Sequence, residues 1–165
     1  AWPSYFPPNK VRGRSEEFAQ FLRRMEEPPL YPVAPDQPLT IRLLCLPTWA
    51  EPCSVRLEAR GLSFRLWGRE LSGEAGFEVG RLTRCEARLL GEEEAGRARL
   101  LWNYLQFWSL AEEKPEPEVF DGTTYVLEAA EHGHYHIVER PELEWGSTIN
   151  EFAELLQQLA GFRLR

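Results

Sequence analysis

A regular alternation of apolar and polar residues between positions 39 and 90 constrains the fold more than any other feature of the sequence. In 53–60 every second residue is apolar, which is typical of a strand with one buried face. Residues 39–46 form a largely apolar run and predict a strand that is buried on both faces. Gly61 separates 53–60 from a short strand at 62–67, and another alternating segment follows. Together these segments predict an antiparallel meander of about four strands.

Two further strands are expected near the C-terminal end, as a β-hairpin. Asp121 and Gly122 are typical turn residues and lead into a strand at 123–130. A second turn around Gly133 leads back into a strand at 134–140. The hairpin brings the expected sheet to about six strands.

The length of the hairpin turn decides which of its residues face each other. A three-residue turn places Glu128 opposite His136, whereas a two-residue turn places it opposite Ile137. We favour the first register because it gives the Glu128 carboxylate a partner across the hairpin, in His136 or Arg140. On this interpretation Glu128, His136 and Arg140 are structural residues. The same register places four residues together on the opposite, more apolar face: Tyr125, Leu127, Tyr135 and Ile137.

Three segments have the residue spacing of amphipathic helices. The first spans about 16–26, the second opens with the acidic run 92–94, and the third starts at the capping-box pair Thr148 and Glu151 and ends near Gly161. The first helix carries a single apolar face: Phe18, Phe21, Leu22 and Met25. The second is expected to bury one stripe: Ala98, Leu101, Trp102, Leu105 and Trp108.

These elements predict an α+β fold with a single antiparallel sheet of about six strands and helices packed mainly on one face. The first helix is expected at the margin of the sheet. The length of 165 residues suits one domain over residues 1–165. Most of the thirteen prolines precede residue 53. Residues 1–12, rich in proline and aromatic side chains, are therefore expected to form an extended arm packed on the body.

The charge balance limits the classes of partner. Nineteen basic and twenty-six acidic residues give a formal net charge of −7, which argues against nucleic acid or anionic lipid as the main partner. No apolar run approaches the roughly 20 residues of a membrane helix, and the first residues lack the layout of a signal peptide. We therefore expect a cytoplasmic protein that binds neither nucleic acid nor membrane.

The three cysteines favour a structural interpretation. Cys45, Cys53 and Cys85 form no C-x-x-C pair, and their odd number leaves at least one thiol unpaired. A Cys45–Cys53 bridge could form if the two residues lie on adjacent strands. Small buried apolar side chains in a reducing compartment are the favoured interpretation.

The histidines are the only pattern in the chain that suggests a metal site. His134 and His136 would project from one face of a strand, and with His132 they could bind a metal ion. However, His132 falls in the expected turn, so solvent-facing or carboxylate-paired histidines are the better interpretation. The motifs of serine and zinc hydrolases and of phosphate-binding loops are missing. The sequence therefore predicts no catalytic residue, no cofactor and no metal.

Several short segments of the C-terminal half follow a familiar pattern. They are Gln106-Phe107-Trp108-Ser109-Leu110, Phe120-Asp121-Gly122 with Tyr125 and Glu128, Tyr135-His136 with Val138 and Arg140, and Phe152, Leu155, Leu156, Leu159, Ala160 and Gly161. In these segments, over roughly residues 100–162, the chain resembles small bacterial proteins encoded beside secreted polymorphic toxins. Some of those proteins are similar to immunity proteins of Rhs or type VI effectors.

The resemblance implies a protein-binding module, an immunity-type protein that neutralises a cognate bacterial toxin by occluding its active site. The acidic charge agrees with this function, because a toxin that acts on nucleic acid tends to present a basic cleft. The densest acidic cluster supplies the candidate partner-binding residues: Glu112, Glu113, Glu116 and Glu118. The protein is expected to be a monomer before it binds. Two alternatives stay open: an enzyme of unknown reaction centred on Glu128 and the histidine hairpin, and a scaffold or regulatory protein without a toxin partner.

Overall fold

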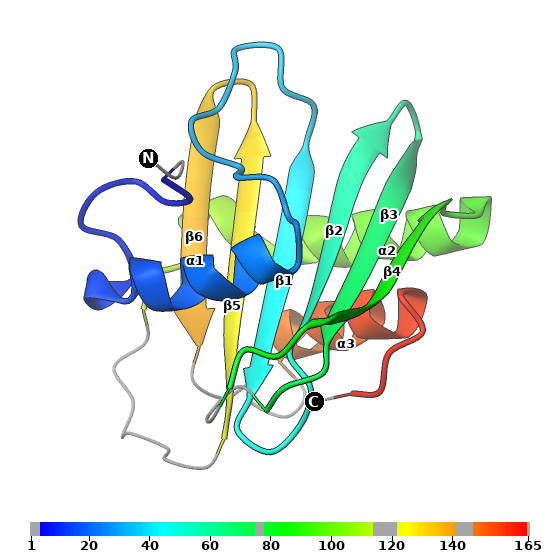
Figure 1. The fold of residues 1–165 in the computed structure, drawn as a ribbon. Helices are drawn as coiled ribbons and strands as arrows, with labels where there is room; N and C mark the ends of the chain where they lie inside the picture. Colours follow the sequence, from blue (N-terminus) through cyan, green and yellow to red (C-terminus); the bar gives the residue numbers. More distant parts are fainter. Residues whose placement is uncertain (1–3, 75–77, 114–121, 141–146, 165) are drawn as a thin grey trace.

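The computed structural model describes residues 4–74, 78–113, 122–140 and 147–164 (Figure 1). These residues form one open six-stranded antiparallel sheet and three α-helices, which confirms the predicted α+β fold. The strands are β1 (Thr40–Pro47), β2 (Cys53–Arg60), β3 (Ser63–Leu71), β4 (Leu82–Leu89), β5 (Thr123–Glu131) and β6 (His134–Arg140). The helices are α1 (Ser15–Arg24), α2 (Glu92–Leu105) and α3 (Thr148–Leu159), with short 3₁₀ turns η1 (Val11–Gly13) and η2 (Phe107–Ser109).

The sheet has the strand order β4-β3-β2-β1-β5-β6, with β1 and β2 at its centre. Strands β1 to β4 form the predicted meander, and the β5–β6 hairpin extends the sheet beyond β1. Every residue of β1 is buried, as its apolar run predicts. Cys45 and Cys53 lie directly opposite each other in β1 and β2, and both are buried free thiols. Cys85 is also free and is exposed on the edge strand β4.

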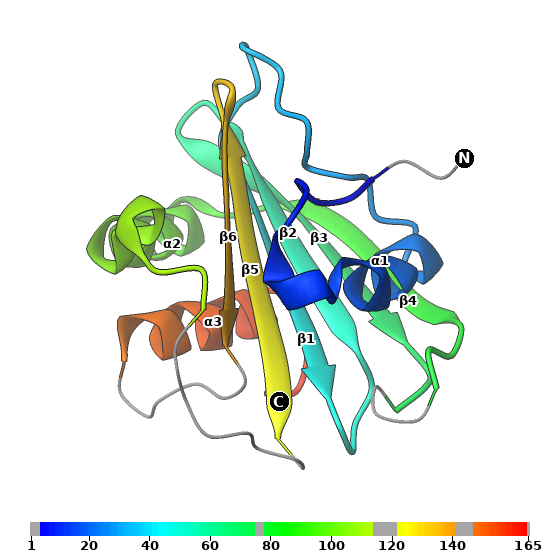
Figure 2. The same cartoon turned by 90° about the vertical axis from the view of Figure 1, so that its left-hand side faces the viewer.

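Both faces of the sheet carry helices (Figures 1 and 2). The helices α2 and α3 cover one face, and α1 lies across β5 and β1 on the other face. The expectation that α1 lies at the margin is therefore wrong. The physical reason is its apolar stripe, which is fully buried and packs on apolar side chains of the sheet: Leu44, Leu46, Val126 and Ile137.

Both ends of α3 follow the sequence signals closely. The cap of α3 is Ser147, one residue before the predicted Thr148, and its hydroxyl accepts a hydrogen bond from the Asn150 amide at 3.2 Å. At the other end Gly161 has a φ of +74°, and the Phe162 amide donates to the Gln157 carbonyl at 2.9 Å. This is a Schellman-type helix end, which confirms the C-terminal role predicted for Gly161.

The predicted register of the β5–β6 hairpin is wrong by one residue. Glu128 faces Ile137, and Ala129 faces His136. The turn has two central residues, His132 and Gly133, with φ of 45° and 81°. Positive φ at both positions is what a type I′ turn requires, and that turn matches the twist of the strands. Consequently Glu128 points toward α1 and His136 toward α2, while the four residues grouped by the prediction divide between the faces: Tyr125 and Leu127 toward α2 and α3, Tyr135 and Ile137 toward α1.

The partner of Glu128 is Arg42 of β1 rather than His136 or Arg140. Both side chains are fully buried, and Nε and Nη2 of Arg42 lie 2.8 and 2.7 Å from Oε2 of Glu128. The Tyr135 hydroxyl donates to Oε1 of Glu128 at 2.7 Å, and Arg42 Nη1 donates to the Pro28 carbonyl at 2.5 Å. Burial lowers the pKa of Arg42, but the Glu128 and Glu27 carboxylates outweigh burial and hold this pKa above its ordinary value.

Replacing Glu128 by Ala should lower the free energy of unfolding by about 3–5 kcal/mol, because the Arg42 guanidinium would be left buried without a counter-charge. Urea denaturation measures this loss. The control is Glu16→Ala, which removes an 80% exposed carboxylate paired with Arg23 and should cost less than about 1 kcal/mol. Equal losses from the two substitutions would contradict the structural role of the buried pair.

Candidate functional site

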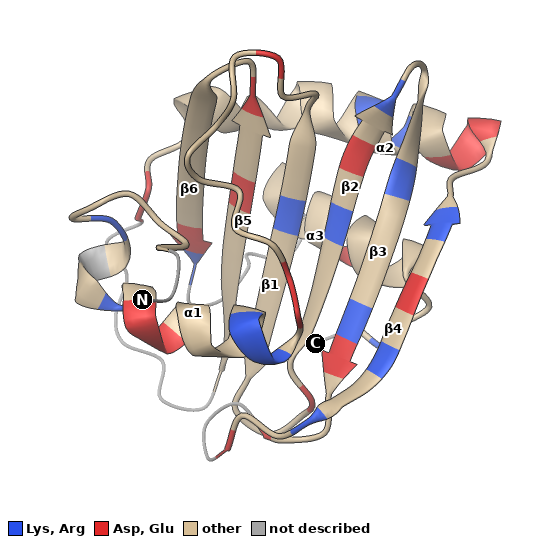
Figure 3. Cartoon of the chain, turned by 45° about the horizontal axis from the view of Figure 1, so that its top comes forward, with Lys and Arg blue, Asp and Glu red and all other residues tan. Residues whose placement is uncertain are grey.

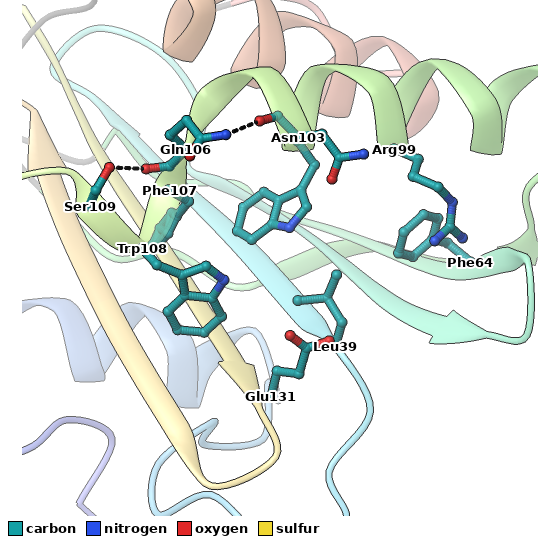
Figure 4. Close-up of a pocket in the computed structure, with 10 residues that line it drawn as sticks. Leu39, Phe64, Arg99, Asn103, Gln106, Phe107, Trp108, Ser109 and Glu131 are labelled. Atoms are coloured by element: carbon teal, nitrogen blue, oxygen red, sulfur yellow. Dashed lines mark hydrogen bonds between the residues drawn. The ribbon is translucent and has the colours of Figure 1, made fainter.

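A groove of about 550 Å³ opens where the C-terminal end of α2 meets the sheet and the tip of the β5–β6 hairpin (Figure 4). It combines aromatic walls with a few polar groups, a composition typical of binding sites. Its lining comes from four regions of the chain that are distant in sequence: Leu39, Phe64, Arg99, Trp102, Asn103, Gln106, Phe107, Trp108, Ser109 and Glu131.

A sharp reversal at the end of α2 builds the upper wall of the groove. Gln106 adopts a left-handed conformation with φ of 51° and ψ of 47°, which ends the helix and starts η2. Its side-chain amide donates to the Asn103 carbonyl at 2.9 Å, and the Ser109 hydroxyl donates to the Gln106 carbonyl at 2.8 Å. These bonds hold the turn that presents Trp108.

The two tryptophans of this wall have different environments. Trp102 is 8% exposed and stacks on Phe107 with ring centroids 5.1 Å apart. Trp108 is 41% exposed, and its ring meets those of Trp102 and Phe107 edge-on at 6.5 and 5.8 Å. The prediction that both belong to the buried stripe of α2 is therefore confirmed for Trp102 and wrong for Trp108. The left-handed Gln106 interrupts the helical periodicity between them.

Glu131, at the end of β5, supplies the negative charge of the groove. Its side chain is partly exposed and points into the groove, toward the space between Trp108 and Leu39 (Figure 4). Within the described residues its carboxylate makes no hydrogen bond or ion pair. Arg99 lies at the other end, where its guanidinium donates to the Leu62 carbonyl at 2.9 Å and covers the Phe64 ring at 5.0 Å.

A second hollow of about 600 Å³ adjoins the groove and shares Trp108 and Glu131 with it. The three histidines and Tyr135 supply the rest of its lining. His136 is held in place, since its Nε2 lies 2.7 Å from the Leu110 carbonyl and its ring stands edge-on to Phe107. His134 lies directly opposite Glu131 in the hairpin and is exposed. Among the described residues no three potential ligands lie close enough together to bind a metal ion.

The outer surface of α2 beside the groove is apolar for a solvent-facing helix. Leu100 and Tyr104 are 58% and 72% exposed and lie one helical turn apart, and the exposed Trp108 follows in η2. On its other side α2 borders a shallower groove against α3, which Arg97, Leu101, Glu151 and Glu154 line among others. Exposed aromatic residues between two grooves form a surface suited to binding another protein.

The acidic segment predicted to bind a partner is partly structural. The Glu112 carboxylate accepts a hydrogen bond from the Val11 amide at 2.7 Å and pairs with Lys10 at 3.1 Å. The Glu112 carbonyl accepts from the Glu139 amide at 2.7 Å, and Glu113 forms an isolated parallel bridge with Glu139. Glu112 thus ties the N-terminal region to β6. The other two predicted binding residues, Glu116 and Glu118, lie outside the described residues.

Two other residues predicted to be structural, Arg140 and Gly122, make hydrogen bonds to the segments that connect the strands and helices. Arg140 donates to the carbonyls of Ala111 and Glu112, at 3.0 and 3.3 Å. The Gly122 carbonyl accepts from the Thr48 hydroxyl at 2.8 Å, and Asp121 lies outside the described residues. Because Glu128 is buried on the face opposite His134 and His136, the structure does not bring together the residues on which the enzyme alternative was centred.

Comparison with known proteins gives no assignment. No model of a known protein family matches the sequence, and no curated protein matches it. In the described part of the chain no helix combines the length and the apolar character needed to cross a membrane.

Replacing each groove tryptophan by Ala should show, by the loss in free energy of unfolding, which of the two is a core residue. Trp102→Ala should lower the free energy of unfolding by about 3–5 kcal/mol, because it leaves a cavity against Phe107 and Phe152. Trp108→Ala should cost about 1 kcal/mol or less, since much of its ring already contacts water. Chemical denaturation followed by circular dichroism checks both values. A Trp108→Ala loss as large as that of Trp102→Ala would make Trp108 a core residue.

Proposed function

We propose that the protein is a binding module of the immunity type, which binds a cognate bacterial toxin and occludes its active site. The observation that carries the proposal is the set of exposed apolar side chains on α2 and η2: Leu100 and Tyr104 on α2 and Trp108 on η2. Tryptophan and tyrosine are the residue types that most often dominate binding energy at protein interfaces. Such side chains cost free energy when they face water, so a surface that groups them favours a partner.

The segment that presents Trp108 also belongs to the resemblance with immunity-like proteins. The stretch from Gln106 to Leu110 contains the left-handed residue, the 3₁₀ turn and the exposed indole. One of the segments on which the expected resemblance rests therefore carries an exposed aromatic group. This agreement supports placing the contact surface on α2 and η2 rather than on the acidic segment that begins at Glu112.

The charge distribution favours approach of a basic partner from the side of α2. Figure 3 shows basic positions on β1 to β4 and on α1, with acidic positions interspersed on β2, β3 and β4. Glu131 lies at the hairpin tip, beside the C-terminal end of α2. The acidic first turn of α2 lies at the opposite end of the helix, where Glu94 pairs with Arg88 of β4 at 2.7 Å. Glu151 and Glu154 border the groove between α2 and α3. A basic cleft would be attracted to these three carboxylates, Glu131, Glu151 and Glu154.

Binding to the toxin encoded by the neighbouring gene tests the proposal. We expect the association rate constant to fall at least about tenfold between 50 and 500 mM salt, because ions screen long-range attraction. The dissociation rate constant should change much less, since a desolvated aromatic contact is not screened. Surface plasmon resonance measures both. An association rate that does not change with salt would contradict the electrostatic part, and the absence of binding would contradict the immunity function.

A pair of exposed aromatic residues distinguishes the proposed surface from the rest of the molecule. Tyr104→Ala should weaken binding at least about tenfold, mainly through faster dissociation. Trp49→Ala is the matched control, because Trp49 is 62% exposed but lies in the β1–β2 connection. Isothermal titration with the same toxin compares the two variants. If Trp49→Ala weakens binding and Tyr104→Ala does not, the contact surface lies elsewhere.

A further inference from the structure

We propose that the groove between Trp108 and Glu131 receives an arginine side chain of the partner, with its guanidinium stacked on the indole and hydrogen-bonded to the carboxylate. This inference rests on the proposed function, because it names the chemistry that the toxin presents to this site. The groove and the exposed surface of α2 share Trp108. Glu131 belongs only to the groove and Tyr104 only to the exposed surface, so substitutions at these two residues test the two separately.

The first argument is the Glu131 carboxylate. It faces the groove beside the apolar side chains of Leu39 and Trp108, and no described residue pairs with it. A carboxylate beside apolar groups is less well hydrated than one in open water, so its attraction for a cation is stronger there. Arg99, the cation of the same groove, does not neutralise it, because its guanidinium is engaged at the other end by the Leu62 carbonyl and the Phe64 ring.

The second argument is the aromatic wall. The Trp108 indole borders both the groove and the adjoining hollow, so it offers an accessible ring next to the carboxylate. Tryptophan is the best aromatic partner for a cation, and arginine forms this contact more often than lysine. A planar guanidinium can stack on a ring and still donate two hydrogen bonds to a carboxylate, which an ammonium group cannot do.

The same arrangement already exists inside this protein. The Arg56 guanidinium lies 4.0 Å from the centre of the Trp67 ring, and its Nε lies 3.2 Å from each carboxylate oxygen of Glu27. An arginine therefore pairs with one tryptophan and one carboxylate on the opposite face of the sheet. In the groove a tryptophan and a carboxylate are likewise present, but none of the described cations pairs with that carboxylate. The volume of about 550 Å³ is in the range of small-molecule sites and admits a side chain from outside.

A capped peptide tests the inference without the toxin. The probe is acetyl-Gly-Arg-Gly-amide, compared with the same peptide carrying citrulline, which has the shape of arginine but no charge. Titrations are followed by the ¹H–¹⁵N signals of the tryptophan indoles, and the Trp108 signal is identified by its loss in Trp108→Phe. We expect the arginine peptide to shift the Trp108 signal with millimolar affinity and the citrulline peptide to bind at least about tenfold more weakly.

Two charge-matched variants locate the carboxylate that is responsible. Glu131→Gln should weaken binding of the arginine peptide at least about tenfold. Glu93→Gln removes the same charge from an exposed position in the first turn of α2 and should leave binding within about twofold. Equal shifts with arginine and citrulline would overturn the inference in favour of a neutral polar ligand. Equal effects of the two variants, or no shift of the Trp108 signal up to 20 mM peptide, would overturn the site itself.

The toxin supplies the second arm of the experiment. Suppose that the toxin binds, and that Glu131→Gln lowers its affinity no more than Glu93→Gln does. This inference then fails, and the proposed function stands. If the arginine peptide binds as expected and the toxin does not bind at all, the immunity function fails and the groove remains a site for a cationic side chain. The two failures are therefore distinguishable.

Discussion

The ion pair between Arg42 and Glu128 is the constraint on which the rest of the structure depends. Both groups are fully buried between the sheet and α1. Without its partner, either group would leave an uncompensated charge in the interior, which is strongly destabilising. The pair lies across β1 and β5, where Arg42 faces Glu128 in the register. Tyr135 of β6 donates to the same carboxylate and extends the constraint to the hairpin. A one-residue slip of β5 would turn Glu128 to the other face and leave Arg42 alone.

The same register places Glu131 in the groove. Residues separated by an odd number of positions in a strand point to opposite faces, so Glu128 toward α1 requires Glu131 toward α2. One carboxylate is therefore neutralised inside the molecule, and the other faces the groove, where we propose that it binds a partner. The end of α2 completes the site, because the left-handed Gln106 turns the chain into η2 and presents Trp108 beside Glu131.

Local periodicity was sufficient to predict the elements of the fold. The alternation in 53–60 matches β2, and the apolar run at 39–46 matches the fully buried β1. Each pattern arises because one or both faces of the strand are buried. Burial favours an apolar residue at every inward position, so the signal repeats along the whole segment. The position of α1 could not be derived in this way, since an apolar stripe shows that a helix packs but not on which face of the sheet.

The hairpin register failed for a more specific reason. The prediction required a partner for Glu128 within the hairpin, but the partner is Arg42, which lies 86 residues away in the sequence. A contact between residues so far apart in the chain produces no recognisable pattern in the sequence around Glu128. The candidate site is missed for a similar reason: Trp108 fits the helical stripe predicted for the second helix, and Glu131 lies just beyond the strand predicted at 123–130. Only the folded chain shows that the helix ends at Leu105 and that the two side chains line one groove.

Amide hydrogen exchange of the protein alone and in complex with the proposed toxin partner tests the central claim most directly, because it maps the buried surface without any substitution. The account predicts that binding slows exchange in residues 99–109 and 131–136, which form the end of α2, η2 and the hairpin tip, while β3 and β4 exchange at unchanged rates. Slower exchange confined to β3 and β4, with no change at the end of α2, would contradict it.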